Sequence, residues 1–300
     1  MNTVLLPHVP YLENEPLSKH TSYRIGGPAK YLAFPENKAH LENLAKFLKE
    51  KGEAFAILGN GSNVLAPDDG FNGWVIKTTN LKASYARTSN DIVEFGAGTL
   101  NSRILKICSN EGLSGLEYLA GVPGTIGGAV YMNAGTASGW VSQNLLSVDS
   151  FSLVNGGKHY EKDQLKYSYR EQHYLSEDEI ILAAKFQMKT TSSDEIKEKV
   201  VASINKRKLA QPIELPSCGS VFRNPNGTSA WKLIEEAGLR GIKCGGARIS
   251  AKHVNFIVNE GGATRNDVLH LIQLVKEKVL ERTGVSLIEE VVLLKPKYLK

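Results

Sequence analysis

The chain contains few cysteines. Its 300 residues include three of them, Cys108, Cys218 and Cys244. An odd number without short paired spacing argues against a disulfide framework and against a cysteine-based zinc site. We therefore expect no bound metal and a protein that works in the reducing cytoplasm.

Long apolar runs and a strong excess of one charge are also missing. The most apolar window, residues 119–132, is broken by glycine and proline and is too short to cross a bilayer. The N-terminal stretch lacks the basic start and apolar core of a secretion signal. A net charge of +5 with scattered basic residues argues against a nucleic-acid surface, although single cations suit a phosphorylated small molecule. We expect a monomer that binds neither membrane nor nucleic acid.

Glycine, by contrast, is dense between Leu113 and Gly135. Glycine gives up packing and chain entropy, so this density needs a reason. One reason is the close approach of main-chain N–H groups to a pyrophosphate, helped by a helix that begins after Gly121 or Gly124. The alternative is a buried, glycine-rich turn between packed elements.

A second glycine turn, GNGSN, follows the apolar run 55–58. The turn leaves backbone N–H groups free, and Ser62 and Asn63 add neutral donors that suit phosphate oxygens. Taken alone it is also an ordinary turn sequence, and it lacks the GxGxxG pattern of a strand–turn–helix nucleotide site. Two such loops in one region suggest a large dinucleotide held between them.

Hydrophobic periodicity predicts an α+β chain without a regular βαβ rhythm. Expected helices cover residues 39–51, 100–110, 192–208 and 230–237 and a segment capped by Thr264, and expected strands cover residues 55–58, 74–77, 92–95, 148–154, 180–188, 254–258 and 287–294. Ser192 with Glu195 three residues later predicts a capping box, and we place a domain boundary there.

Five motifs in a fixed order carry a family resemblance. They are TSYRIGGPA (Thr21–Ala29), LGNGSNVL (Leu58–Leu65), GLEYLAGVPGTIGGAVYMNAG (Gly115–Gly135), YSYR (Tyr167–Arg170) and CGSVFRNP (Cys218–Pro225). In this order they resemble the UDP-N-acetylenolpyruvoylglucosamine reductase family over nearly the whole chain. The little room between Arg170 and Ile180 resembles its shorter subtype, which lacks a tyrosine-bearing loop insertion.

The resemblance implies a vanillyl-alcohol-oxidase-type FAD-binding region in two subdomains, residues 1–78 and 79–191, followed by an α+β substrate domain, residues 192–300. It implies FAD and NADPH as cofactors. It also implies reduction of UDP-N-acetylglucosamine enolpyruvate to UDP-N-acetylmuramate for peptidoglycan synthesis, and with that a role in cell shape, cell division and the cell cycle. In this chemistry the cofactor carries the hydride and the protein supplies position and field.

The same resemblance assigns three catalytic residues. Ser220 is the expected proton donor, Arg170 polarises the substrate carboxylate, and Glu290 is the acid. Where the family commonly has Leu-Glu-Pro-Glu-Val, this chain has LIEEV, so Glu289 stands at the proline position. In a strand, Glu289 and Glu290 face opposite ways, so one of them reaches the site.

The expected binding residues complete the prediction. FAD contacts are Tyr23, Arg24, Gly26, Gly59, Asn60, Gly61, Ser62, Asn63, Gly121, Val122, Pro123, Gly124, Thr125, Gly127 and Gly128; substrate contacts are Lys208 and Asn224. Three of the predicted site residues have an ordinary alternative role: Ser220 as a turn serine, Arg170 as a surface arginine, and Lys208 as one charge in a solvated basic run. We expect Cys218 to be a small packed residue and His253 to be structural.

Two other functions compete with this one. Another FAD-dependent oxidase of the same cofactor fold would have a different second domain and would leave SVFRNP unexplained. A non-catalytic nucleotide-sugar binding protein would not need Ser220, Arg170 and Glu290 together with both glycine loops.

Overall fold

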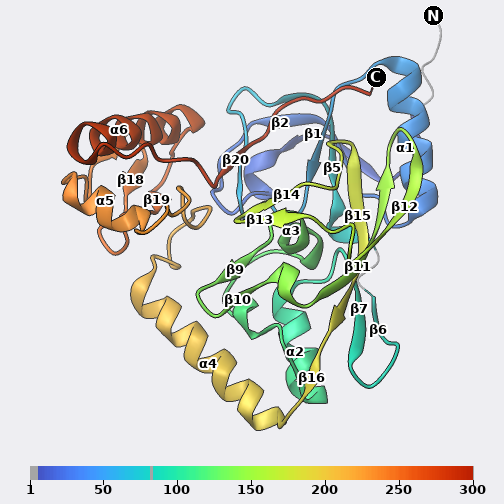
Figure 1. The fold of residues 1–300 in the computed structure, drawn as a ribbon. Helices are drawn as coiled ribbons and strands as arrows, with labels where there is room; N and C mark the ends of the chain where they lie inside the picture. Colours follow the sequence, from blue (N-terminus) through green and yellow to red (C-terminus); the bar gives the residue numbers. More distant parts are fainter. Residues whose placement is uncertain (1–5, 82–83, 300) are drawn as a thin grey trace, which may run out of the picture.

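A computed structural model describes residues 6–81 and 84–299 (Figure 1). The first five residues of the N-terminal stretch lie outside this range. Within the described ranges, no helix is both long and apolar enough to cross a membrane. The chain forms two parts built on larger sheets and a smaller third part with two helices and a three-stranded sheet, which Figure 1 shows in orange and red beside them.

The first part is a four-stranded sheet in the order β1-β2-β5-β3. Its elements are β1 (Tyr11–Pro16), β2 (Pro28–Ala33), α1 (Lys38–Lys51), β3 (Phe55–Leu58) and β5 (Phe71–Lys77). Strands β2, β5 and β3 are parallel, and β1 is antiparallel to β2. Leu41, Leu44 and Leu48 recur at helical spacing and pack against Trp74, so α1 forms where the apolar stripe predicts it.

The second part is an antiparallel sheet in the order β12-β11-β15-β7-β6. Its elements are β6 (Tyr85–Arg87), β7 (Ile92–Gly96), α2 (Asn101–Glu111), α3 (Ile126–Tyr131), β11 (Leu145–Ser152), β12 (Gly156–Glu161) and β15 (Glu179–Gln187). Ile104, Leu105 and Cys108 of α2 are buried in its core, as the helical pattern predicts.

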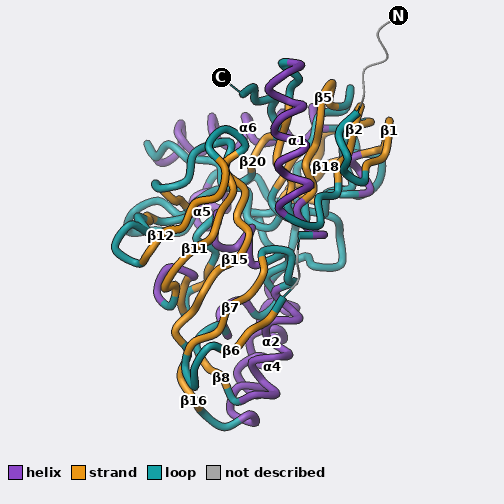
Figure 2. The backbone as a smooth tube through the Cα atoms, turned by 90° about the vertical axis from the view of Figure 1, so that its right-hand side faces the viewer, coloured by secondary structure: helices purple, strands orange, loops and turns teal. Residues whose placement is uncertain are grey.

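Helix α4 (Ser193–Ala210) departs from the expected domain division. Val200 and Ile204 pack on the core of the second part, and α4 lies beside α2 in both views (Figures 1 and 2). The third compact part therefore begins after Ala210 rather than at Ser192. The predicted capping box is also wrong: Ser192 accepts from the N–H of Asp194, whereas the Glu195 carboxylate turns outward to Thr191 and Lys199.

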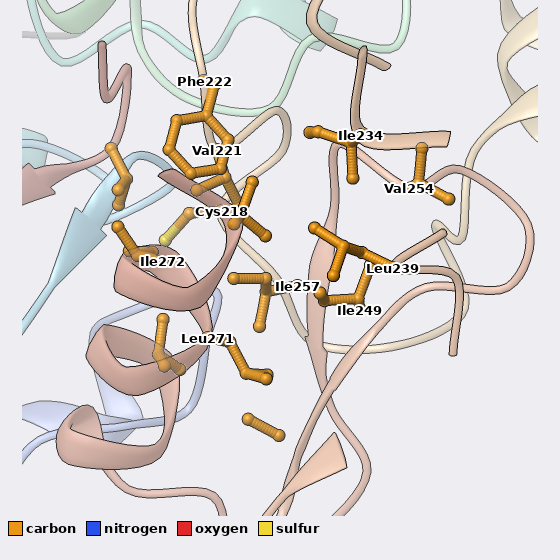
Figure 3. Packing of buried hydrophobic residues seen from close by; sticks show 14 of the residues in the cluster. Cys218, Val221, Phe222, Ile234, Leu239, Ile249, Val254, Ile257, Leu271 and Ile272 are labelled. Carbon is orange, nitrogen blue, oxygen red and sulfur yellow. The ribbon is translucent and has the colours of Figure 1, made fainter. Parts of the chain in front are cut away.

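The third part packs two helices on a small antiparallel sheet. Its elements are α5 (Ala230–Glu236), β17 (Lys243–Cys244), β18 (Ala247–Ile249), β19 (Ile257–Asn259) and α6 (Arg265–Thr283). Thr264 and Asp267 form a capping box at the start of α6, which confirms the expected cap. Figure 3 shows the core, where Phe222 and Ile257 meet Ile272 of α6.

The remaining strands are short. They are β4 (Val64–Leu65), β8 (Leu113–Ser114), β9 (Gly135–Thr136), β10 (Gly139–Trp140), β13 (Tyr167–Ser168), β14 (Glu171–Gln172), β16 (Lys189–Thr190) and β20 (Val292–Leu293). Two of the predicted strands, 254–258 and 287–294, are longer than the strands that form. In the first, the chain turns where the Ser250 hydroxyl accepts from the N–H groups of Lys252 and His253, and β19 begins only after this turn.

The strand expected over 287–294 is reduced to β20, because its first half is held by a single bridge between Phe222 and Glu289. Strand β20 pairs in parallel with β4, and Lys297 pairs with Phe55 at the edge of the first sheet. The C-terminal segment thus returns from the third part to the first.

Candidate active site

A cavity of about 1230 Å³ lies where the three parts meet. Its walls are the loop 59–64, the glycine-rich segment 122–129, the hairpin 167–170, the turn 218–220 and the returning segment 292–297. Each wall segment comes from a different stretch of the chain, so only the folded protein assembles the cavity.

The loop 59–64 is fixed by its own glycine. Gly61 has a φ of +72°, and a Cβ there would lie 2.1 Å from the carbonyl oxygen of His20. Behind the loop, the buried Nζ of Lys77 donates to the Gly59 carbonyl at 3.2 Å. Asn63 Nδ2 donates to the Glu290 carbonyl at 2.9 Å. The loop is therefore tied both to the first sheet and to the far end of the chain.

The second glycine loop lies against the first. Ser62 Oγ donates to the Pro123 carbonyl at 3.2 Å, and Asn101 Nδ2 donates to the Val122 carbonyl at 3.2 Å. Helix α3 begins just beyond, at Ile126, so the helix start expected after Gly124 lies one residue further along.

The two loops together form a cradle. Within the described residues, the buried Thr125 Oγ1 has no hydrogen-bond partner. Gly59 and Gly128 face the cavity with no protein atom closer than 3.8 Å to where a Cβ would stand. Bare backbone, an unpartnered hydroxyl and space on this scale suit a dinucleotide pyrophosphate. The donor set therefore fits FAD.

Arg170 and Glu290 meet in the cavity wall, with 2.9 Å between Nε and Oε1. Arg170 has a φ of +61°, unusual for a residue with a side chain, and its Nη2 donates to the Gly135 carbonyl at 2.7 Å. These contacts fix the guanidinium at the site, which rules out the alternative of a freely solvated surface arginine.

Burial dominates the electrostatics of Glu290. It raises the pKa of the Glu290 carboxyl, and the positive charges of Arg170 and Arg223 partly offset the rise. The neighbouring Glu289 instead pairs with Lys276 on α6, with 2.9 Å between the charged atoms. As expected, one glutamate of the pair reaches the cavity.

Ser220 is half-buried in the wall, between two residues that hydrogen-bond to other segments of the chain. Cys218 Sγ contacts the Val64 carbonyl at 3.2 Å, and the Val221 N–H donates to the Asn255 carbonyl at 2.8 Å. The Val221 carbonyl accepts from the Glu290 N–H at 2.7 Å, so Glu290 and Ser220 sit on adjacent backbone segments. Burial raises the pKa of the Cys218 thiol well above its ordinary value, consistent with its expected packing role.

Most predicted site residues line the cavity. They are Gly59, Asn60, Gly61, Ser62, Asn63, Val122, Pro123, Gly124, Thr125, Gly127, Gly128, Arg170, Ser220, Asn224 and Glu290. Asn224 also has a structural task, because its Oδ1 accepts from the Ala230 N–H at the start of α5.

Five predicted residues lie outside the wall. Tyr23 is fully buried in the core of the third part, and Arg24 turns the chain beside it with a φ of +56°. Gly26 packs against Leu17 and Ala66. Gly121 abuts the Arg207 side chain, and Lys208 is exposed, with its carbonyl accepting from Lys252 Nζ.

Arg207 lines the cavity, and sequence reasoning missed it in favour of Lys208. Helical spacing does not separate the two residues. Val200 and Ile204 form the face that packs on the second part, and Arg207 and Lys208 follow Ile204 at i+3 and i+4, which are both neighbours of Ile204 on that face. The packing of α4 decides, because it brings Arg207 to the cavity and leaves Lys208 exposed.

Comparisons with known proteins agree with this geometry. Residues 211–294 match the family described as UDP-N-acetylenolpyruvoylglucosamine reductase, C-terminal domain, and residues 29–156 match the family described as FAD binding domain. UDP-N-acetylenolpyruvoylglucosamine reductases from Geotalea uraniireducens and Carboxydothermus hydrogenoformans are 39% and 40% identical, over 93% and 94% of this chain and 92% and 93% of theirs. The chain belongs to the UDP-N-acetylenolpyruvoylglucosamine reductase family.

A solved structure supports the same assignment for this reductase. The UDP-N-acetylenolpyruvylglucosamine reductase (MurB) from Thermus caldophilus matches with a TM-score of 0.79 and 34% identity, covering 96% of this chain and 99% of that one. The reductase is an FAD-containing oxidoreductase, and its FAD-binding domain lies within an α+β fold. Only residues 173–178 join β14 to β15, so the chain is of the short subtype.

Proposed function

We propose that this reductase converts UDP-N-acetylglucosamine enolpyruvate to UDP-N-acetylmuramate, with electrons from NADPH, in peptidoglycan precursor synthesis. The observation that carries the proposal is the Arg170–Glu290 ion pair on the wall that also holds Ser220 and both glycine loops. When bound, FAD would supply the hydride chemistry, taking a hydride from NADPH and delivering one to the methylene carbon of the enolpyruvyl group.

Arg170 binds and polarises the substrate carboxylate. Its guanidinium has a planar set of donors that matches a carboxylate, and Gly135 and Asn133 hold it from behind through their carbonyl oxygens. A cation fixed there stabilises the negative charge that develops on the carboxylate when the neighbouring carbon gains electrons.

Ser220 donates its hydroxyl proton to the carbon next to the carboxylate, and solvent returns a proton to the serine oxygen. A serine is a weak acid, so the step depends on close placement rather than on a favourable pKa. Glu290 acts as the acid on the same reacting group, a role supported by its backbone hydrogen bond to Val221 and by its ion pair with Arg170. Asn224 and Lys208 stay proposed contacts to the nucleotide-sugar, Lys208 from outside the cavity wall.

The test separates the two half-reactions in the Ser220→Ala variant. Reduction of the bound flavin by NADPH, followed anaerobically by loss of its absorbance, should stay within about threefold of wild type. Turnover of the enolpyruvyl sugar should fall at least about 100-fold, the ordinary contribution of a general acid. Ser217→Ala is the matched control, since Ser217 takes part through its carbonyl, which accepts from Ser22.

Three outcomes contradict the proposal. Equal loss of both half-reactions would remove Ser220 from its assigned role. A yellow protein whose flavin NADPH cannot reduce would indicate a different flavin-dependent oxidase. A chain that retains no flavin after reconstitution would indicate a nucleotide-sugar binding protein.

A further inference from the structure

Arg207 extends from the last turns of α4 across the second glycine loop. A Cβ on Gly121 would lie 2.9 Å from Arg207 Cδ, and Gly121 has a φ of +71°. The glycine is thus required twice, for its backbone conformation and for the passage of the arginine stem. Arg207 lines the cavity beyond this crossing, alongside Val122 and Pro123. The loop and the helix are shaped to bring one guanidinium to the cavity.

In the described part of the chain, this guanidinium has no protein counter-charge. Among residues 6–81 and 84–299, no carboxylate lies within ion-pair distance of Arg207, and its buried Nε has no hydrogen-bond partner. Glu290, the acid of the cavity wall, is already paired with Arg170. Burial, together with the like charge of Arg170, lowers the pKa of Arg207. A buried cation without an anion is costly, and a ligand anion is what would offset that cost.

Lys208 does not compete for this role. Its side chain is exposed, and the neighbouring Lys252 reaches past it to its backbone carbonyl and to Glu214. A cation held in solvent contributes little to binding compared with one that is partly desolvated.

We propose that Arg207 binds the diphosphate of a nucleotide ligand in this cavity. The inference rests on the proposed function, which brings two such ligands to the site: FAD, and the UDP part of the substrate. Both carry the same diphosphate chemistry, which a planar guanidinium recognises through paired hydrogen bonds. Arg170 would then hold the carboxylate and Arg207 the diphosphate.

The experiment compares Arg207→Gln with Lys206→Gln, because Lys206 is an exposed neighbour on the same turn of α4 with no assigned role in binding. Glutamine keeps much of the stem that packs over Gly121 while removing the charge. In one arm, the flavin-loaded full chain is diluted, and the fluorescence of released FAD gives the dissociation constant for FAD. In the other arm, the flavin-loaded chain is titrated with UDP in a calorimeter, which gives the dissociation constant for UDP. Urea unfolding shows whether each variant is folded, and Arg207→Lys serves as a second variant should Arg207→Gln fail to fold.

Arg207→Gln should raise the dissociation constant at least about tenfold in one arm, as expected for a lost charge-assisted contact of about 1.4 kcal/mol. A rise for FAD assigns the cofactor diphosphate, and a rise for UDP assigns the substrate diphosphate. Lys206→Gln should leave both dissociation constants within about twofold of wild type. Unchanged binding in both arms in a folded Arg207 variant, or an equal effect of Lys206→Gln, overturns the inference. Neither arm needs turnover, so a chain that binds both ligands but fails to reduce the enolpyruvyl sugar would refute the proposed function alone.

Discussion

Two glycines of one loop, Gly61 and Gly59, should respond differently to substitution by alanine: the first variant should lose stability and the second should lose FAD affinity. In Gly61→Ala, the new methyl group stands in the left-handed region at a φ of +72° and 2.1 Å from the His20 carbonyl oxygen. Left-handed backbone costs about 1–2 kcal/mol and overpacking about 1–3 kcal/mol, so the free energy of unfolding should fall by about 2–5 kcal/mol. In Gly59→Ala, the nearest protein atom is Thr125 Oγ1 at 3.8 Å, so stability should change by less than about 1 kcal/mol.

The same Gly59→Ala methyl group enters the cavity where the cradle faces the cofactor. We therefore expect its FAD dissociation constant to rise about tenfold or more, equivalent to about 1.4 kcal/mol. Urea unfolding of the flavin-free chain measures the first quantity, and FAD fluorescence quenching measures the second. Gly128→Ala is a parallel case, because Gly128 also has open space toward the cavity. The reasoning is refuted if Gly59→Ala unfolds as easily as Gly61→Ala, or if it binds FAD like wild type.

Two further predictions concern charge and aromatic groups. Burial lowers the pKa of Lys77 from 10.5 to about 8, so between these values the unfolded chain binds more protons. The free energy of unfolding of wild type, relative to Lys77→Met, should therefore rise with pH across this window by up to about 3 kcal/mol in urea titrations, and a flat difference contradicts the shift. Trp140 is 47% exposed and lines the cavity, whereas Trp231 is 43% exposed on α5 and lies outside the wall. Trp140→Ala should raise the KM for the UDP-sugar several-fold through lost aromatic contact, and an equal rise in Trp231→Ala would exclude such a contact.

Much of the fold was predictable because its signals are local. The apolar stripe of α1 and the Thr264 cap of α6 depend on neighbouring residues, and both appear as predicted. The long strand predicted over 287–294 does not form, because its extended backbone has one bridge to Phe222 and a short pairing with β4. Hydrophobic periodicity does not reveal these partners. The capping box predicted at Ser192 does not form, because the Glu195 carboxylate pairs with Lys199 one turn further along α4.

In the candidate site, too, local motifs were predictive, whereas features that depend on tertiary packing were not. Motifs placed Arg170, Ser220 and Glu290, and the structure brings these three to one cavity. The choice between Lys208 and Arg207 needed the direction in which α4 packs, which is a tertiary property. Tyr23 belongs to a flavin-associated motif in sequence, yet its side chain fills the core of the third part. A motif therefore identifies a segment more securely than it identifies which side chain of that segment meets the ligand.

The returning C-terminal segment has a consequence for biosynthesis. Val292 and Leu293 pair with Val64 and Leu65, and residues 292–297 form part of the cavity wall. These residues are synthesised after both glycine loops. Contacts between segments so distant along the chain form slowly, since the intervening loop must first close. Flavin capture should thus wait until this segment has been made and has paired with β4, and stalled nascent chains that lack this segment should purify without colour.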